Sequence, residues 1–137
     1  MTMQARLFLI VGLGAALGSV ARYLISVWMY DFFGAGYGWG TLTVNVLGSF
    51  LIGLYATLTE PDGRLPAITG MRYFVIPGFC GGFTTFSIFS LETLLLVESG
   101  RFALAALHVA ASVMLWLLAV WIGYRAGTHL NRASETF

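Results

Sequence analysis

The sequence contains no lysine, a single cysteine and few charged residues of either sign. Its seven basic residues are all arginines, six acidic residues nearly balance them, and the formal net charge is +1. Because nucleic-acid binding relies on a basic surface, this balance gives no support to a nucleic-acid partner. Cys80 has no second cysteine with which to form an internal disulfide, and the sequence offers no cysteine cluster for zinc.

Apolar residues make up most of the chain. Of 137 residues, 58% are hydrophobic and 9% are charged, which is far from the composition of soluble domains. A helix needs about 20 mostly apolar residues to cross a bilayer, and residues 5–29, 39–59, 71–97 and 102–126 meet this requirement. We therefore expect an all-α membrane protein with four transmembrane helices, built as a single transmembrane domain over residues 1–137. As a multi-pass protein it would reside in a cell inner membrane or plasma membrane.

The connectors between these windows are residues 30–37, 60–70 and 98–101. The second carries a dense turn signature, Glu60-Pro61-Asp62-Gly63-Arg64, and is expected to face solvent. The start of the first window imitates a cleavable signal peptide, but its apolar run continues through Trp28, so residues 7–29 are expected to be a retained span.

Arginines near the span ends favour termini inside the cell only modestly. Five lie on the side of the termini and two on the opposite side: Arg6, Arg64, Arg72, Arg125 and Arg132 against Arg22 and Arg101. If Arg72 and Arg125 belong to helix ends, the bias falls to three against two, which is compatible with insertion in both orientations. Because four spans make a bundle too thin to enclose a solvated path comfortably, we expect an oligomer.

The segment Gly81-Gly82-Phe83-Thr84-Thr85-Phe86-Ser87-Ile88-Phe89-Ser90 lies inside the third window. In hydrocarbon every backbone polar group needs a partner, so adjacent glycines followed by adjacent threonines predict that this helix is broken near Gly81–Thr85. Phe86 and Phe89 are three residues apart and share a helix face, with Glu92 on the same side. Glu92 is the only acid inside a window, and three interpretations stay open for it: a vestibule residue, a partner of Arg22 or an interfacial carboxylate.

Small and polar residues also line one face of the first two windows. In the first, Gly14 and Gly18 predict close helix packing, while Arg22, on the same face, either reaches the membrane interface or serves the function. In the second, one face carries Thr41, Asn45, Gly48, Ser49 and Ile52. The Asn45 amide must hydrogen-bond to another helix as a clamp or line a wet path.

The fourth window places His108 and Ser112 four residues apart, with Trp116 next on that face. A lone histidine in an apolar helix is more often a hydrogen-bonded interior residue than a ligand, and this is the interpretation that the sequence favours for His108.

No catalytic arrangement is present, since the single intramembrane acid has no second carboxylate and no phosphate-binding loop occurs. An enzyme is therefore not expected. The windows instead contain hydrogen-bond donors, which suit an anion: Asn45, Ser49, Thr84, Thr85, Ser87, Ser90, Thr93, His108, Ser112 and Arg22. The edge of a phenylalanine ring is the positive part of its quadrupole, so Phe86 and Phe89 extend the same preference.

Three segments, Gly14–Tyr23, Gly40–Phe50 and Gly78–Ser90, closely resemble the CrcB family of microbial fluoride channels, also called Fluc. The resemblance covers the first three windows strongly and the fourth mainly through its length and Ser112. Three separate motifs in the same order make it specific.

The resemblance implies passive, potential-driven fluoride efflux, which confers fluoride resistance, through an antiparallel homodimer of dual topology. Such a dimer contains two fluoride pathways and a central structural sodium ion (Na+), whose implied ligands are the backbone carbonyls of Gly81 and Thr84. The implied fluoride-pathway residues are Asn45, Phe86, Phe89, Ser112, Thr41, Ser87 and His108. Arg22 and Glu92 are assigned to the vestibule.

Two positions depart from the family's pattern. His108 stands where relatives often carry a tyrosine, and Ile88 where a threonine is common, so an altered or shortened polar track is expected. Two other functions compete with the fluoride channel. A small four-span proton-coupled multidrug exporter is expected to carry an acid in its first span, where this chain has Arg22, and a non-conducting assembly subunit would use its glycines for packing alone. Neither accounts for the Gly81–Phe86 motif together with Asn45.

Overall fold

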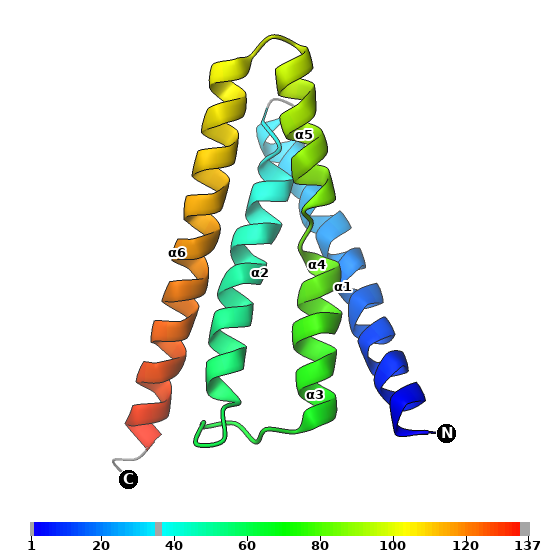
Figure 1. Cartoon of the computed structure of the whole chain (residues 1–137), viewed down its shortest axis with the longest axis vertical. Helices are drawn as coiled ribbons and strands as arrows, with labels where there is room; N and C mark the ends of the chain where they lie inside the picture. Colours follow the sequence, from blue (N-terminus) through cyan, green and yellow to red (C-terminus); the bar gives the residue numbers. More distant parts are fainter. Residues whose placement is uncertain (1, 35–36, 135–137) are drawn as a thin grey trace.

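The computed structural model describes residues 2–34 and 37–134, and within these ranges the regular structure is helical throughout. Figure 1 shows α1 and α6 at the two flanks, with α2 and a column formed by α3, α4 and α5 between them. In chain order the elements are α1 (Met3–Phe33), α2 (Trp39–Leu58), α3 (Thr69–Tyr73), the π-helical η1 (Phe74–Cys80), α4 (Gly81–Phe83), α5 (Ser87–Glu98) and α6 (Phe102–Ser134).

In the described part of the chain, four helical segments are long and apolar enough to cross a membrane: Met3–Phe33, Trp39–Leu58, Thr69–Glu98 and Phe102–Ala133. The four predicted windows are thereby confirmed. The outer helices extend beyond their predicted ends, since α1 continues past residue 29 to Phe33 and α6 continues past residue 126 into the polar C-terminal segment.

The connectors lie at the predicted places but differ at their ends, since residues 30–33 belong to α1 and Glu98 belongs to α5. Helix α1 ends at Phe33, and the φ of 73° at the next residue, Gly34, lies in the left-handed region that glycine tolerates; residues 35–36 lie outside the described ranges. The connector after α2 is mostly exposed, as its turn signature predicts. The start of this connector, directly after α2, is held by Arg72 of α3, whose guanidinium donates to the Thr59 carbonyl and hydroxyl oxygens.

Glycines set how closely the helices approach. A Cβ on Gly18 would lie 2.1 Å from the Phe79 carbonyl oxygen, and one on Gly14 would lie 2.4 Å from that of Phe74, so α1 packs directly on the backbone of η1. On the other side of the bundle, a Cβ on Gly53 of α2 would lie 2.3 Å from the Val120 carbonyl oxygen of α6. The packing role predicted for the first-window glycines is therefore confirmed.

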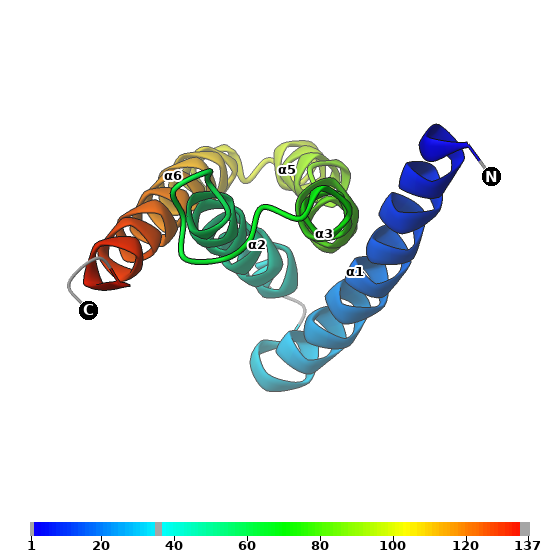
Figure 2. The same ribbon diagram turned by 90° about the horizontal axis from the view of Figure 1, so that it is seen from below.

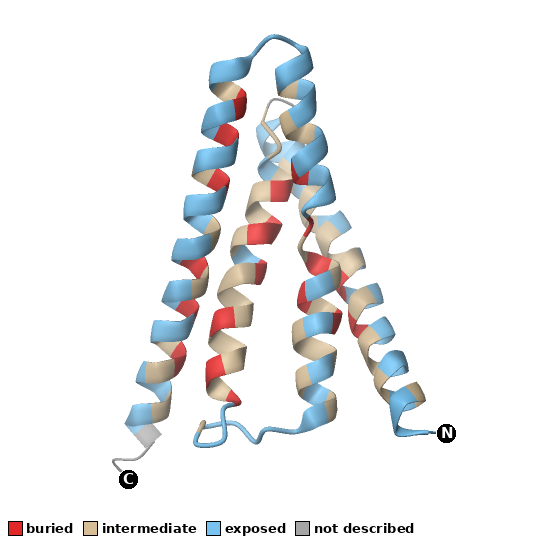
Figure 3. Ribbon diagram, in the orientation of Figure 1, coloured by how far each residue is buried: buried red, intermediate tan, exposed pale blue. Residues whose placement is uncertain are grey.

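Figure 2 shows the consequence of these contacts, with α2 beside α6 and α1 passing across the column of α3 and α5 at a steep angle. Buried residues gather on the facing sides of α2, α6 and the column, while the outer surfaces of α1 and α6 are largely exposed (Figure 3). These exposed surfaces are rich in large apolar side chains, which suits contact with lipid or with another copy of the chain.

Between α4 and α5 the chain leaves the helical path for three residues, 84–86. Thr84 has φ −82° and ψ 161°, an extended conformation that ends α4, and α5 begins at Ser87. The helix before α4 is also irregular, because η1 is π-helical and contains Pro77. Residues 84–86, called the extended segment below, lie beside α1 and α2, and the candidate site is built around them.

Candidate functional site

Asn45 of α2 holds the extended segment in place. Its Nδ2 donates to the Thr85 carbonyl oxygen at 2.8 Å, and its Oδ1 accepts from the Thr85 N–H at 2.7 Å. Both residues are buried, so these two bonds satisfy backbone groups that no longer take part in a helix. The interhelical clamp proposed for Asn45 from the sequence is present; its role in a fluoride pathway stays a prediction.

The bonds around Thr85 leave carbonyl oxygens of the third span without their usual helical donors. In a continuous helix the Thr85 N–H would donate to Gly81 and the Ile88 N–H to Thr84. Here Thr85 donates to Asn45, and Ile88 donates to the Thr85 hydroxyl at 3.2 Å. The carbonyls of Gly81 and Thr84, predicted as sodium ligands, are thus among those that lose their usual helical donors in this segment.

Arg22 reaches this same segment from α1. Its Nη1 donates to the Thr84 carbonyl oxygen at a long 3.4 Å, and the neighbouring Ser19 hydroxyl donates to the Gly82 carbonyl oxygen at 3.4 Å. Arg22 therefore faces the extended segment rather than Glu92, and the ion pair between Arg22 and Glu92 that the sequence left open is not the arrangement found.

Phe86 and Phe89 are in contact, as their spacing predicts, with ring centroids 5.5 Å apart. Their environments differ sharply, because Phe86 is 71% exposed at the protein surface whereas Phe89 is 6% exposed. The Phe89 ring lies between two aromatic side chains of α6, stacked on His108 at 5.1 Å and edge-on to Trp116 at 4.9 Å. Phe89 is therefore the point at which α5 meets the polar face of α6.

That face of α6 carries polar atoms that are buried without hydrogen bonds. His108 is 1% exposed and Ser112 is fully buried. Among the described residues, both His108 ring nitrogens, the Ser112 hydroxyl and the Trp116 Nε1 have no hydrogen-bond partner. The expectation that His108 is a hydrogen-bonded interior residue is wrong in one respect, since the ring is interior but its nitrogens are unbonded. Unpartnered buried donors are costly unless a ligand or water meets them.

Glu92 of α5 also lies beside His108. Its Oε1 accepts from the Thr41 hydroxyl at 2.7 Å, and its Oε2 lies 3.7 Å from His108 Nε2. Tyr37, from the connector before α2, packs its ring edge-on against His108 at 5.4 Å. Thr41, predicted in the pathway, is thus buried and bound to the carboxylate that was assigned to the vestibule.

Two open pockets meet at Glu92 and lead toward this cluster. One, of about 320 Å³, is lined by Ser26, Tyr30, Gly34, Gly38, Trp39, Gly40, Thr41, Ile88 and Glu92. The other, of about 210 Å³, is lined by Tyr37, Gly38, Glu92, Leu95, Leu96, Ser99, Arg101 and His108. The position of Glu92 in both fits the vestibule interpretation made from the sequence.

A third pocket lies where Asn45, Ser49, Ile52, Thr84, Thr85, Phe86 and Trp116 meet, and the Trp116 ring packs against Phe89. Ser87, also predicted in the pathway, instead lies within 3.2 Å of the Thr85 hydroxyl through its own Oγ. The structure therefore groups Asn45, Phe86, Phe89, His108 and Ser112 with Thr41 and Glu92, while Ser87 supports the turn before α5.

Two contributors to this cluster were not assigned to the site from the sequence. Trp116 follows Ser112 by one helical turn, so the face that predicts His108 and Ser112 also contains the signal for Trp116. Tyr37 belongs to a connector without periodicity, and its contact with His108 depends on the path of the chain between α1 and α2.

The profile of the family described as CrcB-like protein, Camphor Resistance (CrcB), matches residues 9–124, which is most of the chain and includes every residue of the cluster. The chain belongs to the CrcB family. Among curated relatives of this CrcB protein, "Fluoride-specific ion channel FluC 1" of Rhodopseudomonas palustris (strain BisB18) is 46% identical over 133 residues, covering 97% of this chain and 94% of the relative.

Two further relatives are named "Fluoride-specific ion channel FluC". The one from Opitutus terrae is 49% identical over 125 residues, covering 91% of the CrcB chain and 95% of the relative. The one from Gluconobacter oxydans is 50% identical over 124 residues, covering 90% and 85% respectively. Together with the four apolar helices, this membership makes the chain a multi-pass membrane protein of an ion-channel family and not an enzyme.

Proposed function

We propose that this protein is a fluoride-selective ion channel that allows passive, potential-driven fluoride efflux and so confers fluoride resistance. The observation that carries the proposal is the row of buried, unbonded donors on α6 beside Phe89, in a chain whose relatives bear the name of fluoride channels. Fluoride is small and strongly hydrated, so a path through apolar protein must replace its water with donors.

The proposed route begins at the two pockets that meet at Glu92 and passes along His108, Phe89 and Ser112 toward the pocket at Asn45. The edges of Phe89 and of Phe86 would present the positive part of the ring quadrupole to the anion. Asn45 retains one amide N–H beyond the bond that it donates to Thr85, and this N–H would be offered to the ion.

We further propose that two subunits of opposite orientation form the working channel, with two pathways. In the single chain Phe86 is 71% exposed, and a pathway wall in that position needs cover from a second copy. Large apolar side chains on the exposed face of α1 supply a surface of the required character. Residence in a plasma membrane or cell inner membrane belongs to the same proposal.

In this proposal the third span is a helix broken near Gly81–Thr85, and the residues there fit a structural sodium ion at the dimer axis. Gly81 is exposed, no atom lies within 4 Å of the position that a Cβ would take there, and its carbonyl has lost its helical donor to Asn45. Thr84 offers a second carbonyl, and the long contact with Arg22 leaves room on its oxygen for another ligand. A two-fold axis would bring two such pairs of oxygens together, which suits a hard cation.

Fluoride release from vesicles that contain the purified protein tests this proposal, and chloride release under the same gradient tests its selectivity. A proton-coupled exporter is not favoured by the findings, because the relatives carry the names of fluoride channels and α1 presents Arg22 at the extended segment.

A further inference from the structure

We propose that Glu92 and His108 together form a proton-binding site that sets how fast fluoride passes. The inference rests on the proposed fluoride pathway, and it concerns a control of that pathway which the channel function alone does not require. Its basis is the geometry of the pair: His108 Nε2 lies 3.7 Å from Glu92 Oε2, just beyond hydrogen-bonding distance, and neither atom has another hydrogen-bond partner among the described residues.

Both ring nitrogens of His108 are unbonded, and Nε2 is the one that faces the Glu92 carboxylate. The other oxygen of Glu92 already accepts from the Thr41 hydroxyl, which fixes the carboxylate toward His108. The imidazole is held between the Phe89 ring on one side and the Tyr37 ring on another, so it cannot turn away freely. A proton on Nε2 would complete a charge-assisted hydrogen bond with Glu92 after a small approach of the two side chains.

Few other charges face this pair. Helix α2, which packs against α6, contains no acidic or basic residue, and α5 contributes Glu92 itself. The two pockets that meet at Glu92 also include Tyr30, Tyr37 and Arg101. Neither a phenol nor a guanidinium ordinarily changes its charge where histidine does, between about pH 5 and about pH 8. Proton uptake in this range therefore belongs to the pair as a unit.

Uptake of one proton changes the charge of the pair from −1 to zero. Because the pair touches Phe89, the unprotonated form places a fixed negative charge beside the proposed anion path, and the protonated form removes that repulsion. Fluoride flux should consequently rise as the pH falls, which is the condition in which fluoride enters cells as its neutral acid.

The test uses full-length protein in vesicles loaded with potassium fluoride, with valinomycin added to start release and a fluoride electrode to follow it. Protein-free vesicles at each pH correct for leakage of the neutral acid. We expect the corrected rate to rise about threefold or more between about pH 8 and about pH 5.5. H108Y, which keeps an aromatic ring without a group that titrates in this range, should remove most of this rise.

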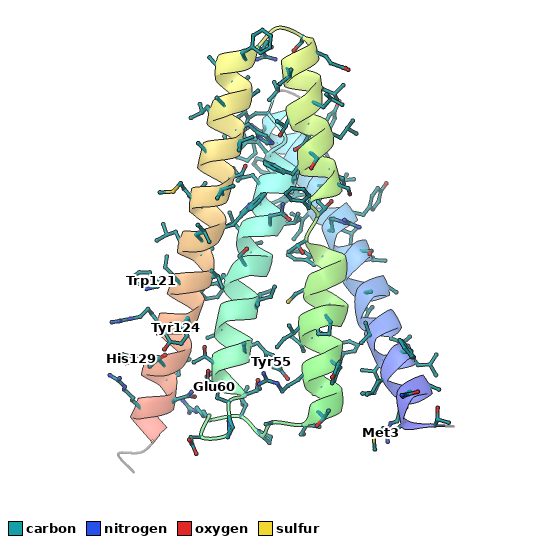
Figure 4. All side chains as sticks on the ribbon, in the orientation of Figure 1. Met3, Tyr55, Glu60, Trp121, Tyr124 and His129 are labelled. Atoms are coloured by element: carbon teal, nitrogen blue, oxygen red, sulfur yellow. The ribbon has the colours of Figure 1, made fainter. Side chains whose placement is uncertain are left out.

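His129 supplies the matched control, because it lies on the outer side of α6 near its C-terminal end (Figure 4). H129Q should keep the pH dependence of the unaltered protein. A rate that is flat or falls with falling pH in the unaltered protein, or an undiminished rise in H108Y, would overturn the proposal. Absence of fluoride release at every pH would instead count against the channel function itself.

Should H108Y fail to fold, histidine NMR gives an independent reading. In H129Q the sole remaining histidine is His108, since the sequence contains two. Its ring resonances in lipid nanodiscs should change with pH, and E92Q should alter that response, because the Glu92 carboxylate faces His108 Nε2 at 3.7 Å. Ring resonances that do not change with pH, or that change in the same way with and without E92Q, would contradict the proposed pair.

Discussion

At the scale of single residues, the two phenylalanines differ more than their spacing implies. Phe86 lies at the protein surface and Phe89 is enclosed by His108 and Trp116. A substitution at Phe89 therefore disturbs both the packing and the proposed path, whereas one at Phe86 disturbs mainly the path. This difference makes Phe86 the cleaner probe of the ring-edge role.

We predict that Phe86→Ile cuts fluoride flux about tenfold or more with little change in the unfolding temperature, because the positive ring edge is lost from a side chain that packs little within its own chain. Phe89→Ile should cut flux similarly and also lower the unfolding temperature. Phe102, which is 66% exposed on α6, provides the control Phe102→Ile with unchanged flux. Normal flux in both pathway variants would refute the role assigned to the rings.

Asn45 combines a structural bond with a proposed contact to the ion. Asn45→Asp replaces the donor that faces the Thr85 carbonyl and adds a negative charge beside the path, so we expect flux to fall to the background of empty vesicles. The lost donor should also cost about 1–3 kcal/mol of stability. Electrode traces and thermal unfolding measure the two effects.

Asn131 is a matched control for this substitution. It too uses both ends of its amide, accepting from the Arg64 N–H and donating to the Thr57 carbonyl oxygen, but it lies near the end of α6. Asn131→Asp should leave flux nearly unchanged. Unaltered conduction in Asn45→Asp would mean that Asn45 serves only as a clamp.

At the scale of helices, the sequence predicts well which segments form membrane-spanning helices. It predicts poorly which side chains of different helices are in contact. Apolar length alone identifies the four spans, and the spacing of Gly14 and Gly18 identifies a packing face. The partners of Arg22 and Glu92 could not be predicted, because the first depends on how α1 crosses the third span and the second on how α2 and α6 lie beside α5. The unbonded state of His108 is likewise a property of tertiary packing rather than of helical periodicity.

Close packing of α1 gives a prediction at this scale. Gly18→Ala places a methyl group 2.1 Å from the Phe79 carbonyl oxygen, so α1 must move away from η1 and the protein should lose about 1–3 kcal/mol of stability. Gly12 lies on the same helix with no atom within 4 Å of its Cβ position, and Gly12→Ala should be neutral or slightly stabilising. Thermal unfolding in detergent compares them, and equal behaviour of the two variants would contradict the packing role of Gly18.

At the scale of the whole molecule, the proposed dimer would supply partners that a single chain does not provide. The carbonyls of Gly81 and Thr84 have lost their helical donors, and Phe86 is exposed. The sequence led to these residues through a resemblance, since nothing in their periodicity specifies a second subunit or an ion.

A sodium ion at the axis predicts that assembly depends on sodium. Replacing sodium with a large organic cation during purification should shift the protein from dimer toward monomer, as measured by light scattering on a sizing column, and restoring sodium should reverse the shift. A dimer that is equally stable without sodium would show that the ion does not hold the subunits together, while leaving the channel function untouched.

The central claim is that the protein conducts fluoride and rejects chloride. Vesicles containing the purified protein and a potassium salt, opened to potassium by valinomycin, measure this directly with an electrode for each anion. We predict rapid fluoride release and chloride release no faster than from protein-free vesicles. Fluoride release at the protein-free rate, or chloride release equal to that of fluoride, would contradict the claim.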